Sequence, residues 1–558
     1  MKQLTAFDYV VFLIYFVIVA GYGYWIYQRK RSKEASSKDF FLAEGSLTWW
    51  AIGASLIASN ISAEQFIGMS GNGFSMGLAI ATYEWMAAAT LLIVGIFFMP
   101  IYLKNRIFTM PQFLRQRYNE TVAMIMAIFW LFLYILVNLT SILFLGALAV
   151  STISGVPFYV CMAGLAVFAI IITIGGMKVI GYTDVIQVFF LILGGLATTY
   201  IALNLVSEKF DTQGVMNGLS LMLNQSADHF NMVFEKGHPH YAALPGLTIL
   251  IGGMWIVNLN YWGCNQYITQ RALGADLKTA RSGILFAAFL KLLMPIIVVL
   301  PGIAAYTLYQ QGMFQTEMLT DGSLNQDRAY PVLLNLLPEG LKGLSFAALT
   351  AAVVASLAGK ANSISTIFTL DIYKKYISKD ATEQQLVWTG RLVIVVAMIL
   401  AIFISPWMGI DKKGGFQFIQ EMTGLVSPGV FAAFIMGFFW KRTNSAGAMF
   451  AIVGGFVLSL FFKFALPKLV SLEPLAAYGF AVKNAESGLY EMPFLDVMGF
   501  VFLICVAVMV ILGLTDNRAA TNPKGLAIDA SMFKVSRSFA IGTAIVFGVL
   551  VVLYTRFW

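Results

Sequence analysis

Long apolar runs, separated by short polar stretches, dominate this chain. A helix needs about 20 mostly apolar residues to cross a membrane. On that basis the sequence predicts fourteen spans. They cover residues 9–28, 48–70, 78–101, 122–150, 156–177, 180–204, 245–265, 283–307, 343–373, 390–408, 417–440, 446–465, 494–514 and 537–555. The pattern therefore indicates an all-α polytopic membrane protein.

The composition agrees with this interpretation. Of the 558 residues, 59% are hydrophobic and 11% are charged, whereas soluble domains carry roughly 25% charged residues. The three cysteines lie inside apolar runs, which excludes a secreted disulfide scaffold. The net charge of +8 comes from basic clusters between apolar runs, as expected for cytoplasmic membrane loops.

The basic clusters also predict an orientation. They follow spans one, three, seven and nine, at residues 29–38, 104–117, 271–281 and 374–379, while the turns at 71–77 and 151–155 carry no Lys or Arg. By the positive-inside rule the clustered loops face the cytoplasm, so both termini lie outside. All three histidines fall in one predicted outer connection, 205–244, so no histidine is expected for a metal site or proton relay within the membrane.

Span two concentrates polar side chains where they are costly. Five of the seven residues from 59 to 65 are polar, and glycines follow at 68 and 71. This pattern predicts a helix that is interrupted in mid-membrane, which frees main-chain carbonyls to bind a cation. The alternative is a polar seam between two helices, where such residues act as glue.

Four other spans carry polar or aromatic residues. Span seven is expected to unwind at its polar centre after Gly252, and span eleven to break between Gly424 and Pro428. The Lys291 ammonium is expected to neutralise acidic residues of spans two and three. The residues concerned are Tyr83, Glu84, Trp85, Asn258, Asn260, Tyr261, Trp262, Asn265, Gln266, Lys291, Gln417, Gln420, Glu421 and Thr423. Carboxylates, carboxamides, an ammonium and aromatic rings in one wet cavity suit a polyhydroxylated ligand.

Several motifs along the chain resemble one transporter family. They are SNISAEQFIGMSG, YEWM, TDVIQVFFLILGG, NLNYWGCNQYITQR and IQEMTGLVSPG. Together they resemble the sodium/solute symporters of the sodium/glucose cotransporter group, most nearly its bacterial sodium/galactose members. The resemblance implies fourteen transmembrane helices and a leucine-transporter-like core of two inverted five-helix repeats with broken helices. Residues 48–204 would form the first repeat and residues 245–440 the second, with 9–28 and 446–555 peripheral.

The resemblance also implies the residues that bind cargo and ion. Substrate contacts would come from Asn60, Glu64, Gln65, Tyr83, Glu84, Asn258, Tyr261, Trp262, Lys291 and Gln420, with Tyr261 as the aromatic lid on the cytoplasmic side. Sodium would be bound by the carbonyls of Ala58, Ile61 and Ala352 and by the Ser356 hydroxyl. Residues 352 and 356 lie one helical turn apart, and a hard cation prefers oxygen ligands.

The chain departs from the family pattern at three positions. Ala355 and Ala87 stand where hydroxyl residues are common, the first beside the sodium ligands and the second in the sugar cavity. The third is Lys360, one turn beyond Ser356. Our hypothesis from the sequence is an intramembrane ion pair between Lys360 and Asp184 that replaces a second sodium ion. The alternative is that Lys360 reaches the cytoplasmic interface and binds nothing.

The sequence thus predicts a secondary active symporter of the bacterial inner membrane, not an enzyme. It would couple inward Na⁺ flow to uptake of a neutral galactose- or glucose-like hexose by alternating access. Its expected partners are the monosaccharide, sodium and membrane lipids, and no nucleic acid. Alternatives with the same fold are myo-inositol, sialic acid or another polar solute as cargo, or proton coupling through Lys360. Two alternatives are not secondary transporters: an intramembrane enzyme and a passive channel. An enzyme is disfavoured because the predicted spans contain no histidine that could act as a catalytic base.

Overall fold

The computed structural model describes residues 4–29, 40–41, 47–320, 322–407, 415–485, 487–521 and 525–558. Helices dominate this part of the chain, and the strands form two short antiparallel hairpins. The hairpins are β1–β2 (Leu319–Thr320 and Ser323–Leu324) and β3–β4 (Val482–Lys483 and Tyr490–Glu491). Residues 30–38 of the first predicted basic segment lie outside the described residues.

Ten helical stretches in the described ranges are long and apolar enough to cross a membrane, or eleven when one bent pair is counted as a span. The stretches are Ala6–Ile26, Glu64–Lys104, Glu120–Ser154, Val179–Lys209, Leu277–Gln310, Leu341–Ile377, Glu383–Trp407, Ser445–Leu469, Phe494–Thr515 and Arg537–Arg556. Predicted spans two, five and seven fall short of this measure. They correspond to the shorter helices α3 (Trp49–Asn60), α10 (Phe158–Ile174) and α14 (Gly253–Cys264). The protein is therefore a multi-pass membrane protein, but the predicted count of fourteen is not reached by this measure.

Span two is interrupted as predicted. Helix α3 ends at Asn60, and Ile61 is extended, with φ −83° and ψ 111°. The chain re-enters a helix as the π-helical segment η1 (Glu64–Met69), followed by α4 (Ser70–Met76). The Ser62 amide donates to Gln65 Oε1 at 3.0 Å. A side-chain acceptor therefore serves an amide that an unbroken helix would bond to its own main chain.

Span seven does not unwind where the sequence predicts. Helix α14 continues through the polar centre, and the breaks lie at Gly252 before it and at Asn265 after it, where α15 (Gln266–Leu273) follows. The prediction was wrong because the helix accommodates its amides: Asn258 Nδ2 donates to the Met254 carbonyl and Asn260 Nδ2 to Ser427 Oγ, each at 3.1 Å. These polar side chains need no break in the helix.

Span eleven breaks as predicted. Helices α20 (Gly415–Gly424) and α21 (Ser427–Phe439) are inclined by 52° to each other. Pro428 lies at the start of α21, where its missing amide hydrogen costs no helical bond.

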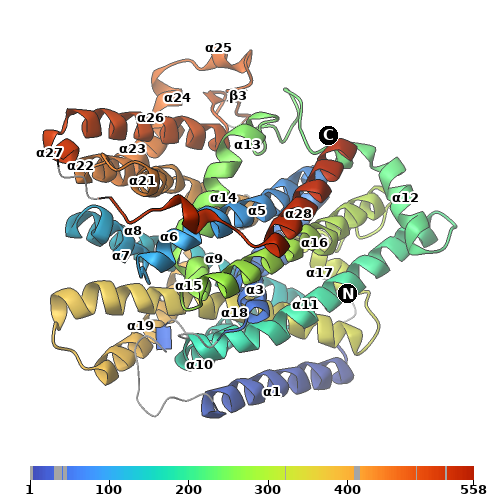
Figure 1. Ribbon diagram of the computed structural model, residues 1–558. Coiled ribbons are helices and arrows are strands. Elements are labelled where there is room, and N and C mark those ends of the chain that lie inside the picture. The colour runs from blue at the N-terminus through green and yellow to red at the C-terminus, as the bar shows by residue number, and fades with distance from the viewer. Residues whose placement is uncertain are drawn as a thin grey trace.

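Four helices pack together in the middle of the molecule (Figure 1). They are α3, α11 (Met177–Lys209), α16 (Leu277–Gln310) and α18 (Leu341–Thr366). Helix α1 (Ala6–Arg29) packs on α11 and α18, and the C-terminal α28 (Arg537–Arg556) packs on α16. The second half adds α21 and α26 (Phe494–Thr515), which pack on each other and on α14.

The remaining segments complete these bundles. They are η2 (Gly77–Ala81), α5 (Thr82–Ile93), η3 (Val94–Phe98), α6 (Met99–Lys104), α7 (Met110–Arg117), α8 (Glu120–Leu133), η4 (Tyr134–Leu139), α9 (Thr140–Ser154), α12 (Val215–Gln225), η5 (Ala227–Phe230), α13 (Thr248–Ile251), η6 (Gln326–Arg328), α17 (Ala329–Leu334), η7 (Ile367–Ile377), α19 (Glu383–Ile404), η8 (Ser405–Trp407), α22 (Ser445–Met449), η10 (Phe450–Gly454), α23 (Gly455–Leu460), η11 (Phe461–Ala465), α24 (Leu466–Leu469), α25 (Glu473–Ala476), α27 (Asn517–Thr521) and η12 (Ala530–Phe533).

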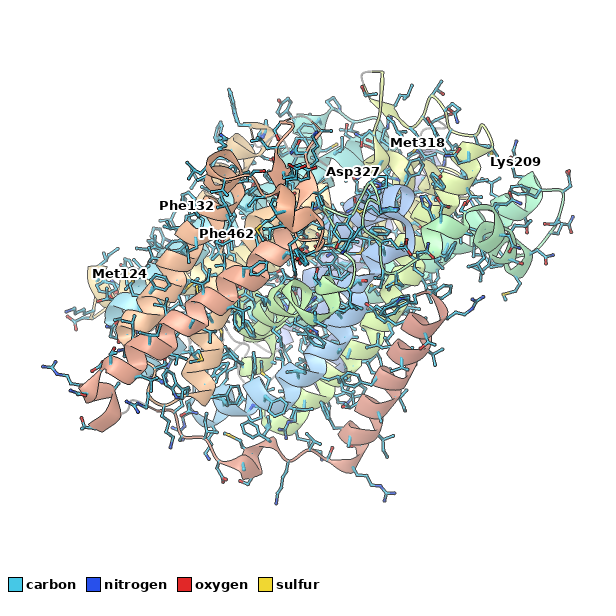
Figure 2. The ribbon with its side chains drawn as sticks, turned by 90° about the horizontal axis from the view of Figure 1, so that it is seen from above. Met124, Phe132, Lys209, Met318, Asp327 and Phe462 are labelled. Carbon is cyan, nitrogen blue, oxygen red and sulfur yellow. The ribbon has the colours of Figure 1, made fainter. Side chains whose placement is uncertain are left out.

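Large apolar side chains cover the outward faces of the helices. Phe132 on α8 is 66% exposed and Val552 on α28 is 67% exposed. Figure 2 shows such side chains, Phe132 among them, at the periphery of the bundle. A soluble protein of this size would not expose so many, whereas hydrocarbon accepts them readily.

Three arginines of the predicted basic loops are buried and serve the fold. The Arg117 guanidinium donates to the carbonyls of Gly437 (2.8 Å), Trp440 (2.8 Å) and Thr443 (3.1 Å) at the C-terminal end of α21. Arg281 bonds to the Gly95 carbonyl at 2.9 Å, and Arg271 is 1% exposed. A helix C-terminus presents unpaired carbonyls and negative dipole charge, which a guanidinium satisfies. The predicted orientation therefore rests on fewer exposed basic residues than the sequence suggests.

Candidate substrate and sodium site

One cavity gathers all the predicted substrate residues. Asn60, Glu64, Gln65, Tyr83, Glu84, Asn258, Tyr261, Trp262, Lys291 and Gln420 line it together. Helices α3, η1, α5, α14, α16 and α20 supply these side chains, so both predicted repeats contribute to the cavity. Lys360 and Tyr267 also line it, as does Ala87, which stands where a family hydroxyl is common.

The Lys291 ammonium holds one side of the cavity together. It donates to the carboxylate of Glu84 and to the side-chain carbonyl of Asn60, and its Nζ lies 5.2 Å from the centre of the Trp262 ring. Lys291 is 1% exposed, so the pairing compensates a charge that has no access to water. The predicted neutralisation by Lys291 is therefore found for Glu84 but not for Glu64, the acidic residue of span two.

The second carboxylate of the cavity, Glu64, has a different cation. Lys360 Nζ on α18 lies 3.5 Å from Glu64 Oε1 and 5.0 Å from the centre of the Tyr267 ring. Lys360 is 3% exposed, so it does not reach the interface.

The predicted ion pair between Lys360 and Asp184 does not form. Asp184 on α11 accepts a bond from Ser55 Oγ at 2.5 Å, and its Oδ2 lies 3.9 Å from the Arg271 guanidinium. Arg271 is fixed by further bonds to the Ser55 carbonyl at 3.0 Å and to the Tyr267 carbonyl. The prediction failed because the broken segment after α3 brings Glu64 to Lys360, while α15 carries Arg271 to Asp184. Sequence reasoning placed Arg271 in a loop, although it ends the NLNYWGCNQYITQR motif.

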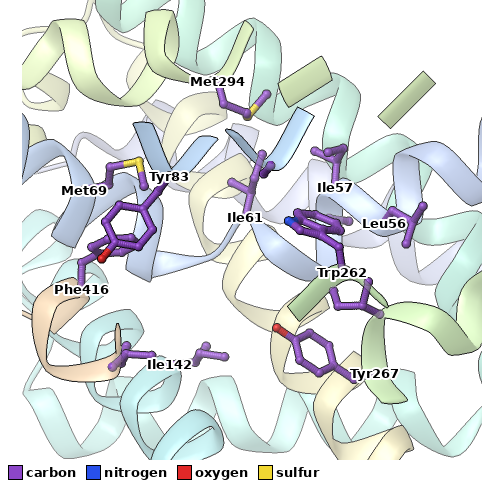
Figure 3. Packing of buried hydrophobic residues seen from close by; sticks show 14 of the residues in the cluster. Leu56, Ile57, Ile61, Met69, Tyr83, Ile142, Trp262, Tyr267, Met294 and Phe416 are labelled. Carbon is purple, nitrogen blue, oxygen red and sulfur yellow. The ribbon is translucent and has the colours of Figure 1, made fainter. Parts of the chain in front are cut away.

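Aromatic side chains close two sides of the cavity. Tyr83 packs edge-on against Phe416, with ring centres 5.1 Å apart. Away from them lie Trp262 and Tyr267, with Ile61 between the two groups (Figure 3). The Tyr261 hydroxyl accepts a bond from Asn60 Nδ2 at 3.0 Å and another from the Tyr267 hydroxyl. The predicted lid residue is therefore tied to the broken end of α3.

The cavity is nearly filled by its own side chains. Its free volume is about 50 Å³. A single water needs at least about 10–15 Å³ by this measure, and sites for drug-sized ligands span roughly 300–1,000 Å³. A ligand of even modest size therefore fits only when the paired side chains separate and exchange their bonds with each other for bonds to the ligand.

Two of the predicted sodium residues, Ala58 and Ser356, meet where α18 crosses the end of α3. Ser356 Oγ donates to the carbonyls of Ala58 at 3.2 Å and Ser59 at 3.1 Å. Ile61 is the extended residue at the break, and Ala352 is buried one turn before Ser356. The groups are neutral oxygens close to a helix end, which fits a hard monovalent cation. Ala355 adds no hydroxyl.

The family model of the "Sodium:solute symporter family" matches residues 40–455 of the chain. The "Sodium/glucose cotransporter" of Vibrio parahaemolyticus is 47% identical over 563 aligned positions, which cover 100% of this chain and 99% of that protein. The human "Sodium/myo-inositol cotransporter 2" is 33% identical over 485 positions, covering 82% of this chain and 70% of that protein.

Among solved structures, a Na⁺-coupled sialic acid symporter in a substrate-bound, outward-open state superposes with a TM-score of 0.75. The match covers 92% of this chain and 98% of that chain at 22% identity, so it establishes a shared fold. The protein is a sodium-coupled transporter and not an enzyme. The chain belongs to the sodium:solute symporter family.

Proposed function

We propose that this protein couples inward Na⁺ flow to uptake of a neutral hexose. The observation that carries the proposal is the cavity in which two Lys–Glu pairs, several carboxamides and flat aromatic rings lie beside the break after α3. Each sugar hydroxyl requires donors and acceptors, which these groups supply, and an aromatic ring covers the C–H face. The 47% identity to a sodium/glucose cotransporter over the whole chain supports the same cargo class.

The charge balance of the cavity favours a neutral cargo. Glu64 and Glu84 each face one lysine, so the lining carries no net charge. An anionic cargo such as sialic acid would have to bring its carboxylate into a closed site without a spare cation, which is costly. Myo-inositol is the second candidate, because it is neutral and hydroxyl-rich and a relative that is 33% identical is a sodium/myo-inositol cotransporter.

The mechanism that we propose is alternating access. Sodium would join the carbonyls of Ala58 and Ile61 to Ala352 and Ser356, and so fix the broken end of α3 in the form that binds sugar. Asn60, the last residue of α3, would then exchange its bond to Lys291 for bonds to the cargo, and opening of the Tyr261 lid would release it inward. Coupling requires only that sodium binds the sugar-competent state more tightly, and the effect is reciprocal.

The energetics allow a single sodium ion to suffice. One charge crossing about 150 mV supplies roughly 3.5 kcal/mol, and a tenfold sodium gradient adds about 1.4 kcal/mol. Together these concentrate a neutral sugar on the order of a thousandfold. We further propose a location in the bacterial inner membrane with both termini outside, fourteen crossings and two inverted repeats at residues 48–204 and 245–440.

The direct test is uptake of labelled glucose and galactose into proteoliposomes in sodium or choline buffer. Sodium-dependent accumulation, competed better by hexoses than by myo-inositol or sialic acid, is the expected result. Uptake driven equally well by a proton gradient in choline would instead favour the proton-coupled alternative. Competition won by myo-inositol would retain the symport mechanism and replace the cargo.

Replacing Ser356 with alanine should weaken sodium binding specifically. Loss of one hydroxyl ligand, worth about 1.5 kcal/mol, should raise the sodium concentration for half-maximal uptake by about tenfold. Sugar affinity at saturating sodium should change much less. Ser365→Ala on the same helix is the matched control, because its hydroxyl bonds to the Gly390 carbonyl and not to α3. An unchanged sodium dependence of S356A would remove this residue from the proposed site.

A further inference from the structure

Three buried carboxylates, two in the cavity lining and one beside α3, each lie next to a basic side chain. Glu84 pairs with Lys291, Asp184 lies beside Arg271, and Glu64 pairs with Lys360. All six residues are at most 7% exposed. Burial of a carboxylate without a partner is costly, so each acidic group needs a cation from somewhere.

The pair formed by Lys360 and Glu64 joins the same two segments as the proposed sodium ligands. Lys360 lies four residues after Ser356 on α18, and therefore one turn along the same face. Glu64 lies three residues after Ile61, at the start of η1. The pair thus joins α18 to the broken segment, as the proposed sodium ligands do, but through two opposite charges of the protein itself.

The contact is one of charge more than of hydrogen bonding. Its Nζ–Oε1 distance of 3.5 Å exceeds the roughly 2.7–2.9 Å of a strong charge-assisted bond. By contrast, Lys291 donates to two acceptors, Glu84 and Asn60. Lys360 instead sets its ammonium over the face of Tyr267 at 5.0 Å, a contact that also depends on positive charge.

We propose that Lys360 is a tethered counter-ion that takes the place of a second transported cation. It neutralises Glu64 from within the protein, so that a single positive charge, the sodium ion at Ser356, moves with each sugar. When Lys360 is absent, the buried Glu64 carboxylate must recruit Na⁺ or H⁺ from solution. That ion would travel with the cargo, because Glu64 lines the cargo cavity. Lys360 thereby acts as a positioning residue that sets the ion stoichiometry.

The test is the ratio of charge to sugar moved, measured in voltage-clamped proteoliposomes for the parent chain and for Lys360→Met. The parent should move one charge per sugar and K360M two. Equivalently, each additional 60 mV of membrane potential should raise the ratio of internal to external sugar about tenfold in the parent and about hundredfold in K360M. A structural role alone would change rate or yield and leave this ratio at one. A ratio of one in an active K360M would overturn the proposal.

Two further variants keep the test decisive. Lys342→Met removes another buried lysine of α18 and should leave the ratio at one. The double variant K360M/E64Q removes the cation and the carboxylate together. No buried negative charge then needs an ion from solution, so the ratio of charge to sugar should return to one. Should K360M prove inactive, a double variant that moves two charges per sugar would still contradict the account.

This inference rests on the proposed sodium-driven uptake, and the two fail differently. A parent chain with no sodium-dependent sugar uptake would remove the proposed function. A parent that couples one charge to each sugar, with K360M doing the same, would remove only the role of Lys360.

Discussion

Lys291→Met is expected to raise the sugar concentration for half-maximal uptake by at least about 100-fold. The change leaves the Glu84 carboxylate and the Asn60 carbonyl without their shared donor in a buried cavity. Hydrogen bonds to charged groups are worth about 1.5–3 kcal/mol each, and an uncompensated buried charge costs roughly 3–5 kcal/mol. Both groups are proposed cargo ligands, so their loss of position should appear mainly in sugar binding.

The measurement is the concentration dependence of hexose uptake at saturating sodium in proteoliposomes. Lys342→Met, which removes a buried lysine outside the cavity lining, is the control for general damage. Size-exclusion profiles establish that the variant remains folded. A half-saturating concentration within a few-fold of the parent would show that Lys291 does not organise the cargo site.

Arg271→Met is expected to destabilise the folded protein by about 3–5 kcal/mol, because it strands the buried carboxylate of Asp184. It also removes the bonds to the carbonyls of Ser55 and Tyr267, which tie α3 to α15. The guanidinium is also tightly packed against α18, since a Cβ at Gly359 would lie 2.5 Å from its terminal nitrogen. Thermal unfolding in detergent measures the effect.

Two comparisons separate the ion pair from simple loss of volume. Arg281→Met removes a buried guanidinium that bonds to carbonyls such as that of Gly95, so it should cost less. The double variant R271M/D184N removes both charges and should recover part of the stability of R271M. If R271M unfolds at the parent's temperature, the Asp184–Arg271 contact contributes nothing to the fold.

Local sequence patterns predicted the helical class and two of three breaks. The polar run at 59–65 and the pair Gly424 and Pro428 mark breaks that the structure contains. Both patterns are local, because a polar run or a proline without an amide hydrogen interrupts the helix in which it lies. The predicted break in span seven was wrong, since the partners of Asn258 and Asn260 allow the helix to continue. One of these partners, Ser427, lies 167 residues away in the sequence.

The pairing of charges shows where sequence reasoning ends. Family resemblance named the cavity residues, and the structure places all of them around one cavity. Which cation meets which carboxylate depends on how α15 and α18 cross α3, and spacing along the chain does not encode that crossing. The sequence therefore predicts a pair between Lys360 and Asp184 and places Arg271 in a loop. In the structure Lys360 lies beside Glu64, and Arg271 lies beside Asp184.

Equilibrium binding of a labelled hexose to the purified protein, in sodium or in choline, tests the central claim most directly. If sodium at the end of α3 organises the adjacent cavity, sugar should bind at least about tenfold more tightly in saturating sodium than in choline. At the sodium concentration that half-saturates the parent, S356A should show much less of this gain. Equal sugar affinity in both buffers would contradict the account, because an ion that does not favour the sugar-binding state cannot drive uptake.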